Sequence, residues 1–571
     1  TQISIADESY GIDNIVITSN TVQATTDEKV INLTQISNQD ESSITHLEDG
    51  GYVVSWTSLN QDESCDGVYL QRYDVNGNKV GSEQIVNTYY TNNQNDSVIT
   101  GLNNGGYVVV WTSYGQDGSY DGVYMQRFGA NGEKLGAEEQ VAESTLNHQN
   151  QPSVDGLENG GFVVSWTGYN ADTKTYDIFT QRYTNDGVKL QSVEESDTEY
   201  AVTETNTVNE NNSEVAALSD GGYVVVWQGV DSNGSGIYSQ KFDVNGNKVE
   251  DAFLINTVQK GDQYEPQVAD LSNGTYLVTW TDHSVHPPVL KGQIMEGNNL
   301  NKIGDEFQVE NAVFYDPIVG LEDGGFIITW SSNVAGQEDS SGFGIYGQRY
   351  DVNGNVVDSK FLINQIVNGN QQDSDVTYKD GKLIVTWTGN DTNGTGVYSR
   401  EFELVEQKVL SVENFENGAS GWSKSQTING GADTSTFLGR FGGSSGNEDV
   451  SKTYDFGIAN AGQRVTIKFD FYEIDSWDGE SLKVFANGLE VSTNYFHDSY
   501  YGNKDGGTEI KVDGAANIWH SEKHTIEVTA VLDENGKLKL GFGSTLNQAI
   551  ADESYGIDNI VITTNTVQPT T

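Results

Sequence analysis

The chain has 571 residues, enough for two or three domains, and its 83 acidic against 30 basic residues give a formal net charge of −53. A surface this acidic repels nucleic acid and anionic membranes, so neither is expected as a partner. No run is long and apolar enough for direct membrane insertion, no signal peptide is evident, and the lone Cys65 excludes an internal disulfide. The carboxylates suit either simple solubility or a milieu rich in divalent cations.

The first 26 residues hold a stretch that returns near the end of the chain. Ala6–Thr18 recurs letter for letter as Ala551–Thr563, and the surrounding match runs on to Gln23 and Gln568. Residues 1–26 are therefore either the tail of a preceding copy of the C-terminal domain, or a strand that completes this chain's own C-terminal domain. Two copies cannot fill one place in a sheet. We favour the preceding copy, which makes the chain part of a longer multidomain protein.

Residues 27–406 consist of a repeat. A phrase of glycine, an aromatic or aliphatic residue, an apolar run and a tryptophan occurs seven times, at intervals of 50 to 61 residues. A repeat of this length is one supersecondary unit that buries its faces by stacking on its neighbours. Strands that are apolar at every position are covered on both faces, so we expect the tryptophans in the core. They are Trp56, Trp111, Trp166, Trp227, Trp280, Trp330 and Trp387.

The second repeat shows what one unit contains. Its Asn-Gly turn holds the positive φ that hairpins require, and no segment has helical periodicity. The strands that we predict in it are Asp96–Leu102, Tyr107–Trp111, Gly122–Phe128 and Lys134–Val141. Four antiparallel strands in each of seven units predict an all-β fold, a seven-bladed β-propeller of four-stranded blades.

The two ends of the repeat array complement each other. The last unit ends with its third strand, Gly396–Phe402, and has no fourth. A spare strand precedes the first unit, since Glu28–Thr34 resembles the fourth strand Lys79–Val86. We therefore expect an N-terminal strand to complete the last blade, which closes the ring and leaves no exposed edge.

Residues 407–571 are predicted to form a second all-β domain. Period-two alternation with long loops is typical of a β-sandwich, here of a jelly-roll-like kind. Its candidate strands are Val450–Phe456, Arg464–Tyr472, Leu482–Ala486, His524–Thr529, Lys537–Phe542 and Ala551–Thr563.

The densest group of carboxylates lies in this second domain. Glu473 and Asp475 share one face of a strand, and a bend at Trp477–Gly479 would turn the following acids inward. Carboxylates that meet from two segments repel unless a cation lies between them, and oxygen ligands suit Ca²⁺. The alternatives are a solvated acidic hairpin, or a Ca²⁺ that braces a loop without touching a ligand. The expected metal ligands are Glu473, Asp475, Asp478, Glu480, Asp552, Glu553 and Asp558.

A second set of candidates lies in the loops that follow the tryptophan strands. Carboxylates that hydrogen-bond hydroxyls, beside flat rings that stack on sugar faces, are typical of carbohydrate recognition. The loop face of any acidic propeller has a similar composition, so this pattern is equally compatible with plain surface loops. The candidate ligand-binding residues are Asp62, Asp66, Tyr114, Asp117, Tyr120, Asp121, Tyr169 and Asp172.

Two resemblances bear on function. The spacing Glu473-x-Asp475-x-x-Asp478 resembles the E-x-D-x-x-E strand of a family of β-sandwich glycosidases, although the third position here is Asp. The phrases GGYVVVW and GVYMQRF, with Phe415–Trp422, Phe437–Gly443 and Asp475–Glu480, resemble modules of giant Gram-negative biofilm adhesins of the RTX type. This resemblance implies a Ca²⁺-dependent exported protein on the bacterial cell surface, whose modules bind glycans or proteins on other cells.

Three functions remain open at this point. The first is an adhesin fragment that binds surface glycan or another surface ligand in a Ca²⁺-dependent way, for cell attachment and biofilm formation. The second is a structural spacer or self-association module of a long adhesin fibre, which the regularity of the first two repeats favours. The third is a glycan hydrolase acting through Glu473 and Asp475. We expect a binding protein and not an enzyme.

Overall fold

The chain is all-β and divides into two compact units. One unit runs from Val22 to Leu404, and the other comprises Val405 onward together with the N-terminal residues up to Thr21. Apart from a 3₁₀ turn at Ile458–Asn460, the regular elements of the described residues are strands, and none of these residues belongs to a helix that could cross a membrane. The computed structural model describes residues 18–34, 37–62, 64–191, 200–203, 208–298, 300–309, 317–333, 339, 341–357, 360–391, 394–429, 435–442, 446–475, 477–497, 508–510, 521–546, 550 and 553–566.

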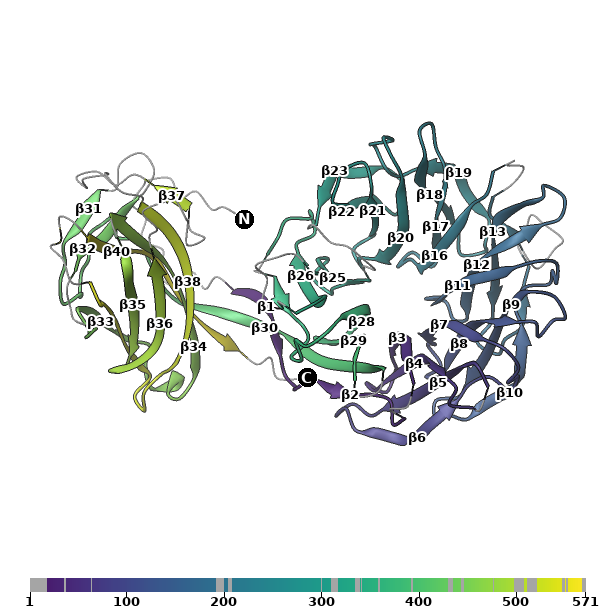
Figure 1. Ribbon diagram of the computed structural model, residues 1–571, viewed down its shortest axis with the longest axis horizontal. Coiled ribbons are helices and arrows are strands. Elements are labelled where there is room, and N and C mark those ends of the chain that lie inside the picture. Colours follow the sequence, from purple (N-terminus) through teal and green to yellow (C-terminus); the bar gives the residue numbers. More distant parts are fainter. Residues whose placement is uncertain are drawn as a thin grey trace. The chain divides into compact units, whose positions relative to one another are not determined.

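The first unit is a closed, propeller-like ring of antiparallel sheets, most of them four-stranded (Figure 1). The first strand of each sheet contacts the first strand of the next, and β28 contacts β3, so the ring has no gap. In chain order the sheets are β3 (Gln39–His46), β4 (Tyr52–Leu59), β5 (Asp66–Tyr73) and β6 (Lys79–Ile85); β7 (Gln94–Gly101), β8 (Tyr107–Tyr114), β9 (Asp121–Phe128) and β10 (Lys134–Gln140); β11 (Gln149–Gly156), β12 (Phe162–Asn170), β13 (Thr175–Tyr183), β14 (Lys189–Leu190) and β15 (Tyr200–Ala201); β16 (Asn211–Ala217), β17 (Tyr223–Val230), β18 (Ser235–Phe242) and β19 (Lys248–Leu254); β20 (Gln263–Asp270), β21 (Thr275–Asp282), β22 (Val289–Glu296) and β23 (Lys302–Gln308); β24 (Ile318–Gly320), β25 (Phe326–Ser332), β26 (Gly344–Tyr350) and β27 (Phe361–Leu362); and β28 (Gln371–Lys379), β29 (Lys382–Asn390) and β30 (Thr395–Glu413) with β1 (Thr18–Ala24) and β2 (Lys29–Val30).

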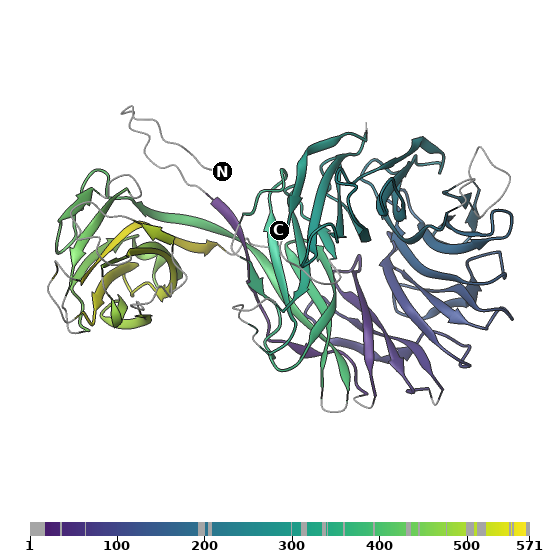
Figure 2. The same cartoon turned by 45° about the horizontal axis from the view of Figure 1, so that its top comes forward.

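The apolar second strands hold the sheets together. The seven repeated tryptophans are at most 1% exposed, as the sequence predicts. Each core cluster combines two neighbouring sheets: Val53 and Leu70 of one sheet pack with Val109 and Trp111 of the next. Figure 2 shows these sheets side by side around the ring. Because each sheet is covered on both faces by its neighbours, its second strand has an apolar run up to the tryptophan, and the few Ser and Thr within the strands, such as Ser55 and Thr57, are buried as well.

The inner edge of the ring is satisfied by side chains. Among the described strands, the first strand of each sheet pairs only with the second, so the N–H groups on its inner edge need other acceptors. Ile44 N–H donates to Asp375 Oδ2 (2.9 Å), Ala217 N–H to Asp155 Oδ2 (2.9 Å), and Gly101 N–H to Thr45 Oγ1 (3.0 Å). In each case the acceptor lies on the first strand of a neighbouring sheet. These strands surround a cavity of about 430 Å³.

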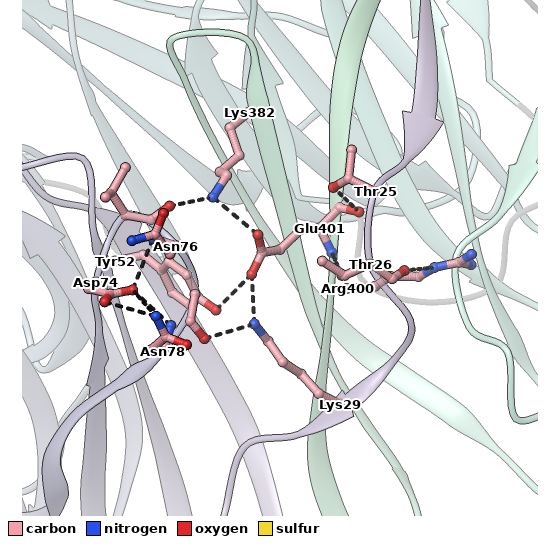
Figure 3. Close-up of polar contacts among 12 residues, drawn as sticks. Thr25, Thr26, Lys29, Tyr52, Asp74, Asn76, Asn78, Lys382, Arg400 and Glu401 are labelled. Carbon is pink, nitrogen blue, oxygen red and sulfur yellow. Dashed lines mark hydrogen bonds and ion pairs between the residues drawn. The ribbon is translucent and has the colours of Figure 1, made fainter. Parts of the chain in front are cut away.

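The N-terminal strand joins the last sheet, as predicted, but as a shorter element than Glu28–Thr34. In β2, Lys29 lies opposite Ser399 and Val30 opposite Tyr398 of β30. Glu401 of β30 fixes this junction: it accepts hydrogen bonds from Lys29 Nζ (2.6 Å) and Tyr52 OH (3.2 Å), and Lys382 Nζ lies 3.1 Å away (Figure 3). One buried carboxylate therefore connects the N-terminal strand, the last sheet and the first sheet.

The second unit has two sheets that share one core. Ile467 and Ile557 from the first sheet pack in the same cluster as Val484 and Leu540 from the second. The first sheet contains β31 (Thr427–Asn429), β32 (Thr436–Phe441), β40 (Glu553–Thr566), β34 (Arg464–Asp475), β38 (Ser521–Val531) and β37 (Thr508–Ile510), with the end of β30 paired to β40. The second contains β33 (Val450–Asp455), β39 (Lys537–Ser544), β35 (Asp478–Ala486) and β36 (Leu489–His497).

The C-terminal copy of the duplicated sequence occupies a central position in this unit. As β40 it pairs with β34 on one side and with β32 and β30 on the other. The N-terminal copy, up to residue 17, lies outside the described residues. The C-terminal copy therefore fills the place between β34 and the pair β32 and β30.

Candidate functional site

Glu473 and Asp558 lie on two opposite faces of one sheet of the second unit. Glu473 is 3% exposed, and its Oε2 lies 3.2 Å from His524 Nε2. Asp558 is fully buried; it accepts hydrogen bonds from Ser435 Oγ and from Tyr472 OH (3.3 Å). Because Tyr472 and Glu473 are adjacent in β34, their side chains point to opposite faces. Glu473 and Asp558 are thus not ligands of one ion.

The rest of the expected metal set is described only in part. Glu480 is buried in β35. Asp475, Asp478 and Glu553 have a described backbone only, and Asp552 lies outside the described residues. Within the described part of the chain, no three His, Cys, Asp or Glu side chains are grouped as a metal site requires. The described side chains by themselves do not fit the expected Ca²⁺ site.

In the backbone register, acidic positions nevertheless lie opposite one another on these strands. Glu473 of β34 lies opposite Glu522 of β38, which in turn lies opposite Glu509 of β37. At the end of the sheet, Asp475 lies opposite Glu553. Like charges directly opposite each other destabilise a sheet. His524, 3.8 Å from Glu522 Oε2, offsets part of this charge when protonated. Sequence spacing identified Glu473, but Glu522 and Glu509 emerge only from the strand register.

Two of the five candidate loop aspartates, Asp62 and Asp117, are turn residues. Asp62 Oδ1 accepts a hydrogen bond from Ser64 N (3.0 Å), and Asp117 Oδ1 accepts one from Ser119 N (2.9 Å). Both side chains therefore stabilise the turns in which they stand. Asp172 is exposed. Asp66 begins β5, and burial raises its pKa, with smaller contributions from the charges of Glu41 and Asp62.

Tyr120, Asp121 and Tyr169 are brought together with two residues that sequence reasoning missed, His148 and Tyr176. We call these five residues the aromatic cluster. Tyr120 packs on His148 with ring centroids 4.7 Å apart, and Asp121 Oδ2 lies 2.6 Å from His148 Nδ1. Tyr169 and Tyr176 meet edge to face at 5.7 Å. Burial raises the pKa of Tyr176, with smaller contributions from Tyr169, Asp121 and Tyr120.

The backbone explains why the cluster forms. Tyr169 and Tyr176 are opposite residues of β12 and β13. Tyr169 N–H donates to the His148 carbonyl (3.1 Å), which fixes the segment before β11 against β12. Tyr120 is 47% exposed, and Tyr114, at the end of β8, is 41% exposed. An aromatic surface therefore remains open to solvent beside an imidazole that contacts a carboxylate. Tyr176 could have been found from the sequence, because a hairpin between the two strands sets it opposite Tyr169.

The first strands of the ring share an unusual backbone position. At the same bulge of six first strands stands a polar residue with a positive φ of 52° to 54°; these are Glu41, Asp96, Gln151, Asn212, Glu265 and Asp373. Such a backbone is strained for a residue with a side chain, and strain of this kind concentrates at functional positions. Burial and the Glu41 charge raise the Asp96 pKa to about 6, with a smaller contribution from Asp121. Burial raises the pKa of Asp40 to about 7, aided by Glu41.

Comparisons with known proteins give no assignment. No family model matches the chain, and no curated protein matches it. Three similar solved structures are a protein of unknown function from Dyadobacter fermentans (8% identity, 67% of this chain and 99% of that one, TM-score 0.41), Trypanosoma rangeli sialidase (11%, 95% and 96%, 0.37) and a Phanerochaete chrysosporium exo-β-1,3-galactanase solved with β-1,3-galactotriose (12%, 86% and 97%, 0.29). Similarity this low transfers no property to the present chain.

Proposed function

We propose that this protein is a fragment of an extracellular adhesin of the bacterial cell surface, and that it binds glycans through the aromatic cluster. In this proposal each sheet of the ring is one blade of a seven-bladed β-propeller, and the second unit is a jelly-roll-like β-sandwich. The ring supplies a rigid frame, and the loops at one edge of its second and third sheets supply the contacts.

The observation that carries the proposal is the arrangement of Tyr120, His148 and Asp121. The ring of Tyr120 is half exposed and braced by the imidazole, so it presents a flat surface at little entropic cost. Asp121 holds His148 in place and offers carboxylate oxygens to hydroxyl groups. Rings that stack on the apolar face of a sugar, next to acceptors for its hydroxyls, are the chemistry of glycan recognition.

Binding and not catalysis is the function we infer. Glu473, which the glycosidase-like spacing would make a reactive group, is 3% exposed and lies in contact with His524. A sugar at the surface does not reach a carboxylate buried in this way. A spacer role is the second candidate, and the regular packing of neighbouring sheets favours it.

The test is a glycan array followed by titration of a bound glycan with variants of the cluster. Tyr120→Ala should weaken binding at least tenfold because the stacking surface is lost, and Asp121→Asn should weaken it less because it loosens His148. Tyr495→Ala, which removes a 67% exposed tyrosine from β36, is the matched control and should leave the affinity unchanged. A glycan bound equally by all three variants would exclude the cluster, and an array with no bound glycan would favour the spacer.

Ca²⁺ dependence is a separate part of the proposal. Its support is the strand register, which sets acidic positions opposite one another in the second unit: the row Glu509, Glu522 and Glu473, and the pair Asp475 and Glu553. An oxygen-preferring cation would remove this repulsion. The proposal assigns Ca²⁺ a bracing role in the second unit, apart from the aromatic cluster.

A further inference from the structure

An asparagine recurs in the ring at the point where the fourth strand of one sheet leads to the first strand of the next. Asn87 Oδ1 accepts the Val68 N–H of a third strand (2.9 Å), and Asn87 Nδ2 donates to Gln94 Oε1 (3.2 Å), seven residues later. One carboxamide therefore satisfies a backbone donor and a buried acceptor together. The same contacts are made by Asn32 with Val397 (2.9 Å) and Gln39 (2.9 Å), and by Asn256 with Ile237 (2.8 Å) and Gln263 (2.8 Å).

Between the second and third sheets, Ala142 stands in place of this asparagine. The glutamine is still present as Gln149, and its Nε2 donates to the Leu146 carbonyl (2.5 Å), which fixes the orientation of its amide. Gln149 is 1% exposed, and its buried Oε1 has no hydrogen-bond partner among the residues that the structure describes. A buried acceptor without a partner carries a free-energy cost. This oxygen is therefore free to accept a hydrogen bond from a ligand.

A backbone donor faces the same position. The Val123 carbonyl accepts the Val141 N–H (2.8 Å), just as the Val68 carbonyl accepts the Val86 N–H (2.8 Å). The N–H and C=O groups of one strand residue point to the same edge of the strand, so the Val123 N–H points toward residue 142. The alanine side chain has no acceptor for it. The position of Ala142, which is 1% exposed, thus retains the donor and the acceptor that a carboxamide satisfies in other sheets.

This position adjoins the aromatic cluster. Gln149 directly follows His148, and Val123 stands two residues after Asp121 in β9, a distance of roughly 7 Å along a strand. Between Ala142 and Gln149 the chain forms a surface segment in which Leu146 is exposed. The surface to which we assign glycan binding therefore borders a site suited to a carboxamide.

We propose that the Ala142 position is a subsite for the acetamido group of an N-acetylated sugar. In this arrangement the ligand N–H donates to Gln149 Oε1, the ligand carbonyl accepts the Val123 N–H, and the ligand methyl group contacts Ala142. A site that hydrogen-bonds a ligand group rejects analogues that lack the group, because its own buried polar groups are then left unpaired. This inference rests on the proposed glycan-binding function and names the ligand class.

The first experiment uses Ala142→Asn in the full-length chain, because this variant supplies the carboxamide from the protein itself. The probe is a glycan array of matched pairs, each with an acetamido group or a hydroxyl group at the same carbon. The parent should prefer the N-acetylated members by about tenfold or more, which is the effect of leaving a buried acceptor unpaired. Ala142→Asn should lose this preference and melt at a higher temperature than the parent.

Two further variants support the interpretation. Gln149→Leu removes the acceptor without adding an amide and should also lose the preference, so the test does not depend on the folding of Ala142→Asn. Asn87→Ala creates the corresponding arrangement in the first sheet, away from the aromatic cluster. It should lower the melting temperature and leave the preference for N-acetylated glycans unchanged.

A direct readout comes from selective ¹⁵N labelling of valine. Adding N-acetylglucosamine or N-acetylgalactosamine should shift the Val123 amide resonance saturably in the parent and not in Ala142→Asn, whereas glucose and galactose should have no effect. The absence of any shift would overturn the subsite even if no glycan on the array were bound.

The outcomes separate this inference from the function on which it rests. Equal binding of both members of each pair, weakened by Tyr120→Ala, would overturn the subsite and retain the aromatic cluster. A preference that persists in a stabilised Ala142→Asn variant would show that residue 142 has a structural role only, and would also overturn the subsite. A saturable Val123 shift that Tyr120→Ala leaves unchanged would support the subsite and count against the aromatic cluster.

Discussion

One position in the third strands explains why the N-terminal strand joins the last sheet and no other. Arg127, Arg182 and Glu401 occupy this position in their sheets. In several repeats this position is an arginine that reaches the next sheet: Arg127 NH1 donates to the Asn185 carbonyl (3.4 Å) and Arg182 NH1 to the Val244 carbonyl (2.8 Å). In the last sheet the same position is Glu401, which pairs with Lys29 and Lys382. The charge is inverted at this one junction, so Lys29 on the N-terminal strand has a complementary site there and would meet a like charge at an arginine junction.

Glu401→Gln should therefore destabilise the ring by about 1.5–3 kcal/mol, the range for a hydrogen bond to a charged group. Burial raises the Glu401 pKa, but the hydrogen bond and charge of Lys29, with Lys382, outweigh it and hold the pKa below its ordinary value. A lowered folded-state pKa gives stability that is present above the unfolded pKa and lost as the pH falls through the folded pKa. The difference between the variant and the parent in urea unfolding should thus be full at neutral pH and fade in acid.

The control for Glu401 is an exposed ion pair on the same ring. Glu139 Oε1 lies 3.8 Å from Arg127 NH2, and its side chain is 47% exposed. Glu139→Gln should change the unfolding free energy by less than about 1 kcal/mol, as exposed pairs do. A Glu401→Gln variant no less stable than this control would show that the network in Figure 3 does not hold the ring closed.

At the scale of elements, the first strands combine a structural and an electrostatic role. Their inward carboxylates accept backbone N–H groups of neighbouring sheets, and burial raises the pKa of both Asp155 and Asp375 to about 6. Burial likewise raises the pKa of Glu214 on β16 to about 7, although a hydrogen bond from Ser153 opposes it. Ionisation of these buried acids therefore destabilises the inner edge of the ring.

The sign of the pH dependence follows from these raised values. An acid with a raised folded-state pKa stabilises the fold fully below its unfolded pKa, and this contribution is lost as the pH rises through the folded pKa. For Glu214 the window runs from its ordinary value of 4.5 to about 7 and corresponds to at most about 3 kcal/mol. Glu214→Gln should raise the melting temperature at pH 8, leave it unchanged near pH 4, and flatten the profile between.

Glu158→Gln, at an exposed position lining the same cavity, is the comparison for Glu214. It should leave both the melting temperature and its pH profile as they are. If the two variants have the same profile from pH 4 to pH 8, the ionisation of Glu214 has no cost and the cavity is more hydrated than its burial implies.

The sequence was informative about elements to the extent that each element has its own local pattern. The apolar run before Trp111 and the Asn-Gly turn after Phe128 placed β8, β9 and β10 within a few residues, because burial on both faces and turn chemistry are encoded locally. The junction of β2 with β30 was predicted from a missing and a spare strand. The positive φ at Glu41 and Asp96 was not predicted, because the bulge depends on pairing with a neighbouring strand.

At the scale of the whole molecule, sites were harder to predict than strands because a site combines distant residues. The spacing around Glu473 indicated the face that it shares with Asp475, but not that Asp558 would lie on the opposite face of the sheet beside Tyr472. Loop composition selected Tyr120 and Asp121, whereas His148 joins them through a turn 27 residues away. Asp62 and Asp117 have carboxylates of the expected kind, but each carboxylate accepts a backbone N–H of its own turn.

The two units have separate cores, so they should unfold as two transitions, and Ca²⁺ should act on one of them. We expect EDTA to lower the melting temperature of the second unit by roughly 5 to 10 °C, which corresponds to loss of a ligand present at about 100 times its dissociation constant. Calorimetry with and without EDTA measures both transitions in one scan. The ring, whose carboxylates accept hydrogen bonds from its own backbone, should not respond.

Two variants of the same strand make this prediction specific. Glu473→Gln removes one acid from the row with Glu522 and should abolish the response of the second unit to EDTA. Asp470→Asn removes an acid that already pairs with Lys523 Nζ (2.8 Å) and hydrogen-bonds Asn559, the neighbour of Asp558, so it should leave that response intact. An EDTA effect confined to the ring, or an equal response in the two variants, would remove Ca²⁺ from the acidic row and leave His524 as the group that offsets its charge.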